Sequence, residues 1–344
     1  MNLPASLQRT VPSLHRLPLL LLPVLSAAVL LWGSVPVSAA DVWDALCGNA
    51  DAADSAGAYI VLHARLPQLW GAVLCGSALS AAGLVMQTVF ANPLADPSLL
   101  GVNSGAGLGA ACALLLTGWT FAAGGFALSG YLFVMLSALA GALAVIFLLT
   151  VCSALLPGRL HLLVAGVMLS FAVSSLISVL NSLSTAQGVR SFVIWGMGDF
   201  SGVTPERLPV FGTGIAGGLL LLIIYIKPLD ALLLGETYAR NLGIRVRHSR
   251  TMLLVAAGLL CAVPTALCGP ISFIGIAAPH VARLTSRTAG HARLLPASVL
   301  WGADFALLAA ILTRLPGGQV LPLNAVTPLL GVPVVFYLLL RRRN

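Results

Sequence analysis

Charged side chains are scarce in this sequence. Asp, Glu, Lys and Arg together make up 8% of its 344 residues, whereas a soluble globular domain has roughly 25%. Hydrophobic residues supply 59% of the chain, and its mean hydropathy is +1.01. The shortage of charge and the repeated apolar runs exclude an ordinary soluble domain and predict an all-α, polytopic membrane protein.

Lysine is nearly absent, which removes one class of nucleotide site. The single lysine, Lys227, is followed by Pro228, so the P-loop pattern G-x-x-x-x-G-K-[ST] cannot be written anywhere in the chain. The patterns G-x-S-G and H-E-x-x-H are missing as well. We therefore predict that the chain is not an enzyme, has no catalytic residue, needs no cofactor and does not bind ATP through a P-loop.

Cysteine pairs with metal-ligand spacing are also lacking. The six cysteines form no C-x-x-C pair, and most stand inside apolar runs: Cys47, Cys75, Cys112, Cys152, Cys261 and Cys268. Cysteine in such a setting behaves as a small apolar residue. We interpret the six as core residues, without a metal site or a disulfide framework.

The stretch from Arg65 to Gly109 organises the chain. About twenty apolar and small residues follow Arg65, enough to cross a bilayer. The run breaks at Pro93 and Pro97, and each proline removes a backbone donor, which predicts a tight turn between two membrane helices. Small residues on the first helix predict that neighbouring helices approach it closely: Gly71, Gly76, Ser77, Ser80 and Gly83.

Apolar runs along the whole chain predict about ten membrane spans. We expect them at residues 17–39, 61–88, 99–117, 129–152, 161–184, 208–226, 251–268, 271–282, 294–313 and 323–340. The first run could be a signal peptide, but it is longer than a typical h-region, so we favour an uncleaved helix. Residues 118–128 read as a glycine-rich external turn, and residues 185–207 as an interfacial segment.

Basic residues are distributed unevenly between these spans. Ten spans put both termini on one side, and placing that side in the cytoplasm leaves only four of the 18 Lys and Arg residues outside: Arg65, Arg190, Arg207 and Arg314. The other 14 then lie inside, and the inverted orientation would reverse this bias. The positive-inside rule therefore predicts cytoplasmic termini, with residues 1–16 and the loop 227–250 inside.

Several ordered motifs resemble one known family. Arg65-Leu66-Pro67 precedes G-x-x-L-x-x-x-G-x-x-M-Q and then N-P-L-A-D-P-x-L-L-G-V-x-S-G-A. Matching segments recur at Gly235–Gly243, Pro279–Arg283 and Leu321–Thr327. Together they resemble the FecCD family, the permease subunits of bacterial ABC importers for iron chelates, haem and cobalamin. The resemblance covers nearly the whole chain after its first helix.

The resemblance implies a single permease domain over residues 1–344, with the fold of a type II ABC importer in the bacterial inner membrane. It implies a homodimer with the transport pathway on its two-fold axis, lined by the fifth and tenth helices. The implied partners are an ATP-binding subunit dimer, a periplasmic substrate-binding protein and membrane lipid, without nucleic acid. Transport would follow alternating access driven by the ATPase.

The resemblance also assigns candidate sites. Arg65 and Arg314 would meet glutamates of the binding protein, although Gln68 stands where relatives often have a second arginine. Asn92, Pro93 and Leu94 lie where the cytoplasmic gate would be. The segment seated in the ATPase would be Gly235, Glu236, Ala239, Arg240, Leu242 and Gly243.

Two residues receive no transport role. Asp304 is the one acidic residue clearly inside a predicted span, and such residues are often functional. Related permeases more often carry an acid where this chain has Ala310, so no role is transferred to Asp304. His280 follows a proline with no partner ligands nearby in the sequence, which favours a hydrogen-bonded structural role over metal binding.

Two other classes of function compete with an ABC permease. A proton-coupled secondary transporter would use the proton gradient instead of an ATPase, and co-purification of an ATPase would separate the two. A membrane-embedded enzyme would need a nucleophile–base pair or metal ligands inside the membrane, and the sequence offers none. The cargo stays open, with an iron-siderophore complex or haem ahead of cobalamin on family frequency.

Overall fold

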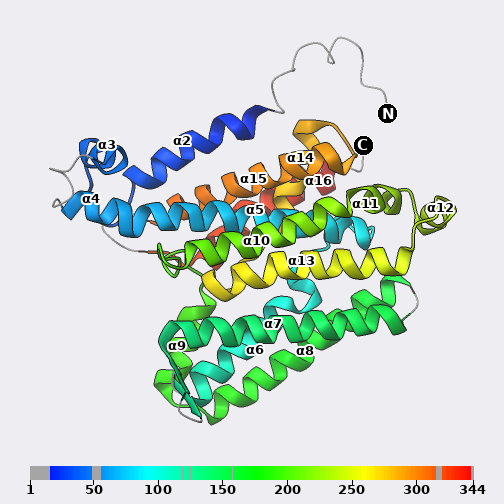
Figure 1. Cartoon of the computed structure of the whole chain (residues 1–344), viewed down its shortest axis with the longest axis horizontal. Helices are drawn as coiled ribbons and strands as arrows, with labels where there is room; N and C mark the ends of the chain where they lie inside the picture. Colours follow the sequence, from blue (N-terminus) through cyan, green and yellow to red (C-terminus); the bar gives the residue numbers. More distant parts are fainter. Residues whose placement is uncertain are drawn as a thin grey trace.

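The computed structural model describes residues 16–48, 56–117, 120–123, 126–156, 158–314 and 320–341. They form a bundle whose long helices run along one direction (Figure 1). Its helices are α2 (Leu17–Leu31), α3 (Ala39–Cys47), α4 (Ala56–Ile60), α5 (Leu66–Val89), α6 (Val102–Ala111), α7 (Gly130–Leu155), α8 (Arg159–Leu183), α9 (Ala186–Gly196), α10 (Leu208–Ile224), α11 (Ile226–Leu233), α12 (Glu236–Asn241), α13 (Val246–Cys268), α14 (Ile274–Ser286), α15 (His291–Leu312) and α16 (Leu323–Arg341).

Within the described residues, five helices are long and apolar enough to cross a membrane, or six if the bent pair α10–α11 counts as one span. Three shorter apolar helices, Leu17–Leu31, Val102–Leu116 and Leu323–Tyr337, and the short α14 occupy the remaining predicted positions. The expected order of elements is therefore confirmed. The first helix is shorter than predicted, because it ends at Leu31 and α3 begins at Ala39.

The second span differs from its prediction at its start. Helix α4, a π-helical turn at Val61–Arg65 and α5 form one continuous helix of 34 residues, Ala56–Val89. Pro67 lies in the first turn of α5, and its missing N–H is accommodated by the wider turn before it. Arg65 therefore lies inside one continuous helix.

Helix α5 lies at the centre of the packing. A Cβ built on Gly76 would lie 2.1 Å from the backbone oxygen of Gly302 in α15, and one on Gly83 would lie 1.9 Å from that of Gly275 in α14. Only glycine permits these approaches. The predicted small residues of this helix are all buried, so the prediction that neighbouring helices approach it closely is confirmed.

A tight turn follows α5, as the two prolines predict. Ala91 adopts a left-handed conformation at φ 48°, and the side-chain oxygen of Asn92 accepts the backbone N–H of Leu94 at 3.0 Å. Asp96 then caps a short 3₁₀ helix by accepting the N–H of Ser98 at 2.8 Å. Burial raises the pKa of the Asp96 carboxyl, and its bonds to Ser98 oppose that rise.

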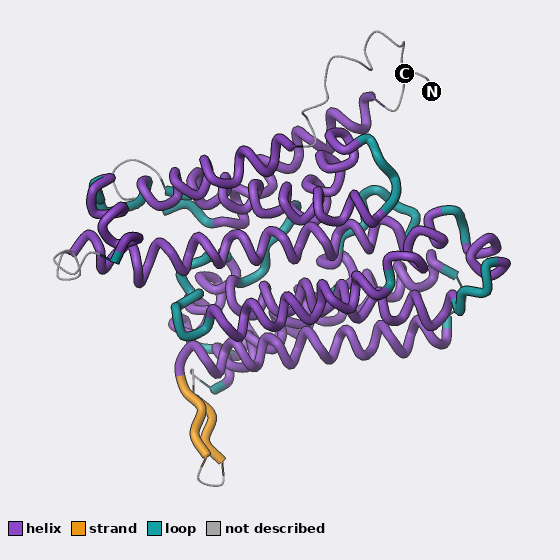
Figure 2. The backbone as a smooth tube through the Cα atoms, turned by 45° about the horizontal axis from the view of Figure 1, so that its top comes forward, coloured by secondary structure: helices purple, strands orange, loops and turns teal. Residues whose placement is uncertain are grey.

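The two ends of the bundle differ. One end carries α3, α4 and α9, and the opposite end carries α11 and α12 (Figure 1); these are called the α3 end and the α12 end below. A two-stranded antiparallel hairpin, β1 (Thr120–Ala123) with β2 (Phe126–Ser129), projects from the bundle (Figure 2). The sequence had predicted only a glycine-rich turn there, and that prediction was wrong for the paired residues.

Candidate functional site

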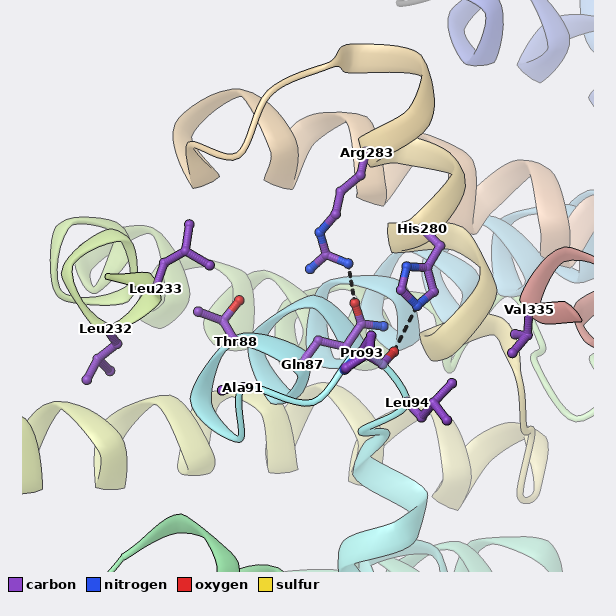
Figure 3. A pocket seen from close by; sticks show the side chains of 10 residues that line it. All are labelled: Gln87, Thr88, Ala91, Pro93, Leu94, Leu232, Leu233, His280, Arg283 and Val335. Carbon is purple, nitrogen blue, oxygen red and sulfur yellow. Dashed lines mark hydrogen bonds between the residues drawn. The ribbon is translucent and has the colours of Figure 1, made fainter. Parts of the chain in front are cut away.

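A cavity of about 420 Å³ lies at the α12 end of the bundle. The turn after α5 contributes Ala91, Pro93 and Leu94 to its wall, α11 contributes Leu232 and Leu233, and α14 and α16 close the other sides (Figure 3). The predicted gate residues Pro93 and Leu94 therefore face the same cavity as the segment that leads into α12.

Two side chains from α14 hold the turn after α5. A ring nitrogen of His280 (Nε2) lies 2.8 Å from the backbone oxygen of Pro93, which can only accept, so His280 donates. Arg283 donates to the side-chain oxygen of Gln87, one turn earlier (Figure 3). The prediction that His280 is hydrogen-bonded is confirmed, and it shares this role with Arg283.

Gln87 continues the same connection into α14. Its side-chain nitrogen donates to the backbone oxygens of Gly275, at 3.3 Å, and Ile276, at 3.4 Å. Both carbonyls lie in the first turn of α14, where Gly83 also allows α5 to approach. The motif G-x-x-M-Q therefore supplies both the close contact and the side chain that bonds across it.

A second set of bonds reaches the end of α5 from α11. The carboxylate of Asp230 accepts the backbone N–H of His291 at 2.8 Å and lies 2.6 Å from Nδ1 of the same residue. Nε2 of His291 lies 2.9 Å from the hydroxyl oxygen of Thr88. His291 and Thr88 are 1% and 3% exposed. Sequence reasoning missed all three residues, because they are 61 and 203 positions apart.

Helix α12 presents one face to its own chain and the other to solvent. Ala239 is fully buried, and Glu236 binds the guanidinium of Arg250, with Arg240 3.7 Å away on its other side. The exposed side instead carries Tyr238 and Leu242. Of the residues predicted to couple to an ATPase, Ala239 and Glu236 thus contact their own chain, and Leu242 and Arg240 are accessible.

Further apolar side chains are exposed beside α12. Leu233 and Leu234, at the end of α11, are 46% and 65% exposed. Gly235 and Gly243, which flank α12, both have positive φ, at 111° and 79°. These glycines set the orientation of the short helix, since a side chain would be strained there. Exposed leucines and a tyrosine are typical of a surface that contacts a membrane or another protein.

The two predicted docking arginines both bind the chain around the end of α2. Arg65, 3% exposed, donates to the backbone oxygens of Leu30 and Val35. Arg314 donates to the backbone oxygen of Trp32 at 2.9 Å and to the side-chain oxygen of Gln68. Carbonyls at a helix C-terminus lack intrahelical partners and attract cations. Burial, and the charge of Arg65, lower the pKa of Arg314.

The face of α8 is exposed along most of its length. Met168, Phe171, Val179 and Leu183 are each more than half exposed. Ser174, Ser178 and Ser182 are also exposed at helical spacing. From Leu162 to Val189 the sequence has no charged residue, so this face combines apolar and hydroxyl groups.

Asp304 is buried near the middle of α15, as predicted. It is 3% exposed, and neither carboxylate oxygen has a hydrogen-bond partner among the described residues. No group of three or more His, Cys, Asp or Glu side chains within the described ranges could hold a metal ion.

The sequence model of the FecCD transport family matches residues 19–341. The chain belongs to this family. The vitamin B12 import system permease protein BtuC of Salmonella paratyphi A is 38% identical over 322 residues, which cover 92% of this chain and 94% of the relative. BtuC of Salmonella typhimurium is 37% identical over 327 residues, with the same coverage.

A solved structure agrees with this assignment. A chain described as an inward-facing conformation of a metal-chelate type ABC transporter matches with a TM-score of 0.79 and 27% identity, covering 96% of this chain and 99% of that one. The type II importer permease fold inferred from the motifs is confirmed. The FecCD chain is a transport permease.

Proposed function

We propose that this FecCD chain is the membrane-spanning subunit of an ATP-driven importer for cobalamin or a chemically similar metal chelate. The observation that carries the proposal is its 38% identity to a vitamin B12 import permease over 92% of its length. Family frequency alone had placed iron-siderophore complexes and haem before cobalamin, and the named relatives favour the reverse order.

The exposed face of α8 supports a bulky cargo without exposed charge. A large ligand can move along the serine hydroxyls and apolar side chains of this face without being bound tightly. Two copies of the permease would place their α8 and α16 faces on either side of a shared pathway. The inner membrane is the expected location, with both termini in the cytoplasm.

The exposed face around α12 supports an ATPase as the energy source. Leu234, Tyr238 and Leu242 form an accessible apolar patch at the end of the bundle where the basic residues are concentrated. The ATPase would bind there as a dimer, one subunit for each permease copy. Gly235, Glu236, Ala239, Arg240 and Gly243 would then act by holding this patch in position.

The corner formed by α2 and the start of α5 is the proposed contact for a periplasmic binding protein. Arg65 and Arg314 lie there, and carboxylates of a partner would compete with the backbone oxygens that they now bind. Charge-assisted pairs with a carboxylate are stronger than bonds to a neutral oxygen.

The experiment is import into proteoliposomes that contain the permease, its ATPase and its binding protein. We expect uptake of radiolabelled cyanocobalamin that requires ATP and continues without a proton gradient. Ferric siderophore and haem are the comparison cargoes. Uptake that follows an imposed proton gradient without ATP would identify a secondary transporter and contradict the proposal.

A further inference from the structure

Three residues from separate helices connect the α12 segment with the turn after α5. Asp230 belongs to α11, which continues through Gly235 into α12. His291 is the first residue of α15, and Thr88 lies in the last turn of α5, four residues before Asn92. None of the three was singled out by a motif, and the role of His280 and Arg283 in holding the same turn does not involve them.

Asp230 binds α15 through two atoms of one residue. Gly290, before α15, has no side chain to cap the helix, and the carboxylate of Asp230 accepts the first N–H instead, at 2.8 Å. The same oxygen lies 2.6 Å from Nδ1 of His291. A carboxylate also stabilises the positive end of a helix dipole. Helix α11 and the start of α15 are therefore joined at two points and should move together.

His291 links Asp230 to α5 through its second ring nitrogen. Because an ionised carboxylate only accepts, Nδ1 donates to Asp230. Nε2, at 2.9 Å from the Thr88 hydroxyl, either accepts its proton or donates to its oxygen. In the second case the hydroxyl keeps its own bond to the backbone oxygen of Leu84, at 3.0 Å. The bond between His291 and Thr88 persists in either form of the ring.

The location of these bonds gives them a mechanical consequence. The cavity separates Leu232 and Leu233 of α11 from Pro93 and Leu94 of the turn. Thr88, the last of the three residues, lies on the wall of this cavity (Figure 3). A displacement of α11 can therefore reach the end of α5 through the part-buried bonds of Asp230 to His291 and the buried bond of His291 to Thr88, while the apolar side chains across the cavity stay apart.

We propose that Asp230, His291 and Thr88 form a positioning relay that transmits movement of the α11–α12 segment to the Asn92–Leu94 turn. The inference rests on the proposed function, since it takes α12 as the ATPase contact and the turn as the gate. The three residues position the gate and contact neither cargo nor nucleotide.

The test follows the gate turn directly. A fluorescent label at Leu94→Cys, with the exposed Cys47 replaced by Ser, reports on the turn in the complete complex with ATPase. ATP should change the signal of the wild-type complex. Thr88→Val and Asp230→Ala should reduce that change, and cyanocobalamin imported per ATP hydrolysed, by about fivefold or more, while ATPase binding and hydrolysis persist. Thr88→Ser keeps the hydroxyl and should restore both.

Ser80→Ala is the matched control. Ser80 is fully buried on α5 and donates to the backbone oxygen of Ser298 in α15 at 2.7 Å, so it joins the same two helices without reaching α11. It should leave the ratio of import to hydrolysis unchanged. An equal loss in Ser80→Ala, or native gate movement in both Thr88→Val and Asp230→Ala, overturns the relay.

Two further variants break the relay one bond at a time. His291→Asn keeps a donor near Asp230, and His291→Gln keeps a polar atom near Thr88. Each should uncouple hydrolysis from import, and they replace Thr88→Val if that variant does not assemble.

Thr88→Val and Asp230→Ala together should reduce coupling by less than the product of their separate effects, because they interrupt one path. Independent effects that multiply fully would contradict the relay. A wild-type permease that neither binds an ATPase nor imports cyanocobalamin would instead overturn the proposed function itself.

Discussion

The guanidinium of Arg314 donates to the side-chain oxygen of Gln68, across the end of α2. The family resemblance led us to expect a second arginine at position 68. The amide oxygen of Gln68 gives Arg314 a neutral acceptor, and Arg65 contacts the same corner through Leu30. The substitution therefore changes how this corner is held as well as its charge.

We expect Gln68→Arg to destabilise that corner. It replaces an acceptor by a cation next to a half-buried guanidinium, at a cost of about 1–3 kcal/mol for the lost partner and the added repulsion. The thermal unfolding temperature of the permease in detergent should fall. Gln68→Glu, which keeps the acceptor and adds a negative charge, is the control and should unfold no earlier than the native chain.

The binding-protein corner can be tested by charge reversal. Arg65→Glu combined with Arg314→Glu should weaken docking strongly, and glutamate-to-arginine changes on the binding protein should restore it. Loss of one partner from a desolvated pair costs about 2–5 kcal/mol, and a rim pair costs little. Affinity in nanodiscs should also fall as salt rises, because exposed pairs are screened beyond roughly 8–10 Å at physiological ionic strength.

This test needs a stability control, because both arginines also bind α2. Arg65→Gln with Arg314→Gln retains donors for the carbonyls of Leu30 and Trp32 but removes the charges. If the double glutamate variant docks as tightly as the native permease at low salt, the arginines only hold α2 in place.

Two neighbouring residues of α12 should behave oppositely. Tyr238→Ala removes an exposed side chain and should weaken ATPase binding by about 1 kcal/mol or more, the usual threshold for an interface residue that matters, with normal unfolding. Ala239→Trp should instead overpack the permease itself, at about 1–3 kcal/mol, because Ala239 is fully buried in its own chain. Pull-down with the ATPase and thermal unfolding separate these results; normal ATPase binding by Tyr238→Ala with Leu242→Ala would exclude this surface.

The contact between Gly83 and Gly275 should tolerate no side chain. Gly83→Ala places a Cβ 1.9 Å from a backbone oxygen, so α5 and α14 must separate. We expect a loss of about 1–3 kcal/mol in stability and impaired transport. Gly217→Ala, in α10 with open space around the added methyl group, is the matched control. Equal unfolding temperatures for the two variants would contradict the close packing.

The orientation predicted from charge can be read with cysteine labels. In a chain whose exposed Cys47 is replaced by Ser, labels at Gln187→Cys and Asn49→Cys should react in intact cells. Labels at Arg247→Cys and Asn344→Cys should react only after the membrane is permeabilised. Labelling of Asn344→Cys from outside would contradict the ten-span topology. Gln187 and Arg247 are both exposed, and Asn49 and Asn344 lie outside the described residues.

The sequence by itself determined the class of protein and the order of its helices. Apolar runs long enough for a bilayer, broken by prolines and glycines, can be recognised locally, because the cost of exposing backbone in lipid acts on each segment separately. The small residues of α5 could be recognised from the sequence as well, because glycine and serine in a membrane helix mark where another helix can approach closely. The hairpin after Thr120 could not, since pairing of two short strands leaves little local signal.

Only the tertiary structure decided which polar groups meet. His291 and Thr88 are separated by 203 positions, and Gln68 and Arg314 by 246. Neither the spacing of residues nor the composition specifies such pairs, because they depend on which helices pack against one another and in what register. The same packing buries Ala239 and leaves Tyr238 exposed, although both stand in one short motif. Sequence motifs pointed to the candidate gate and coupling segments, and the helix contacts determined which of their side chains are buried and which are exposed.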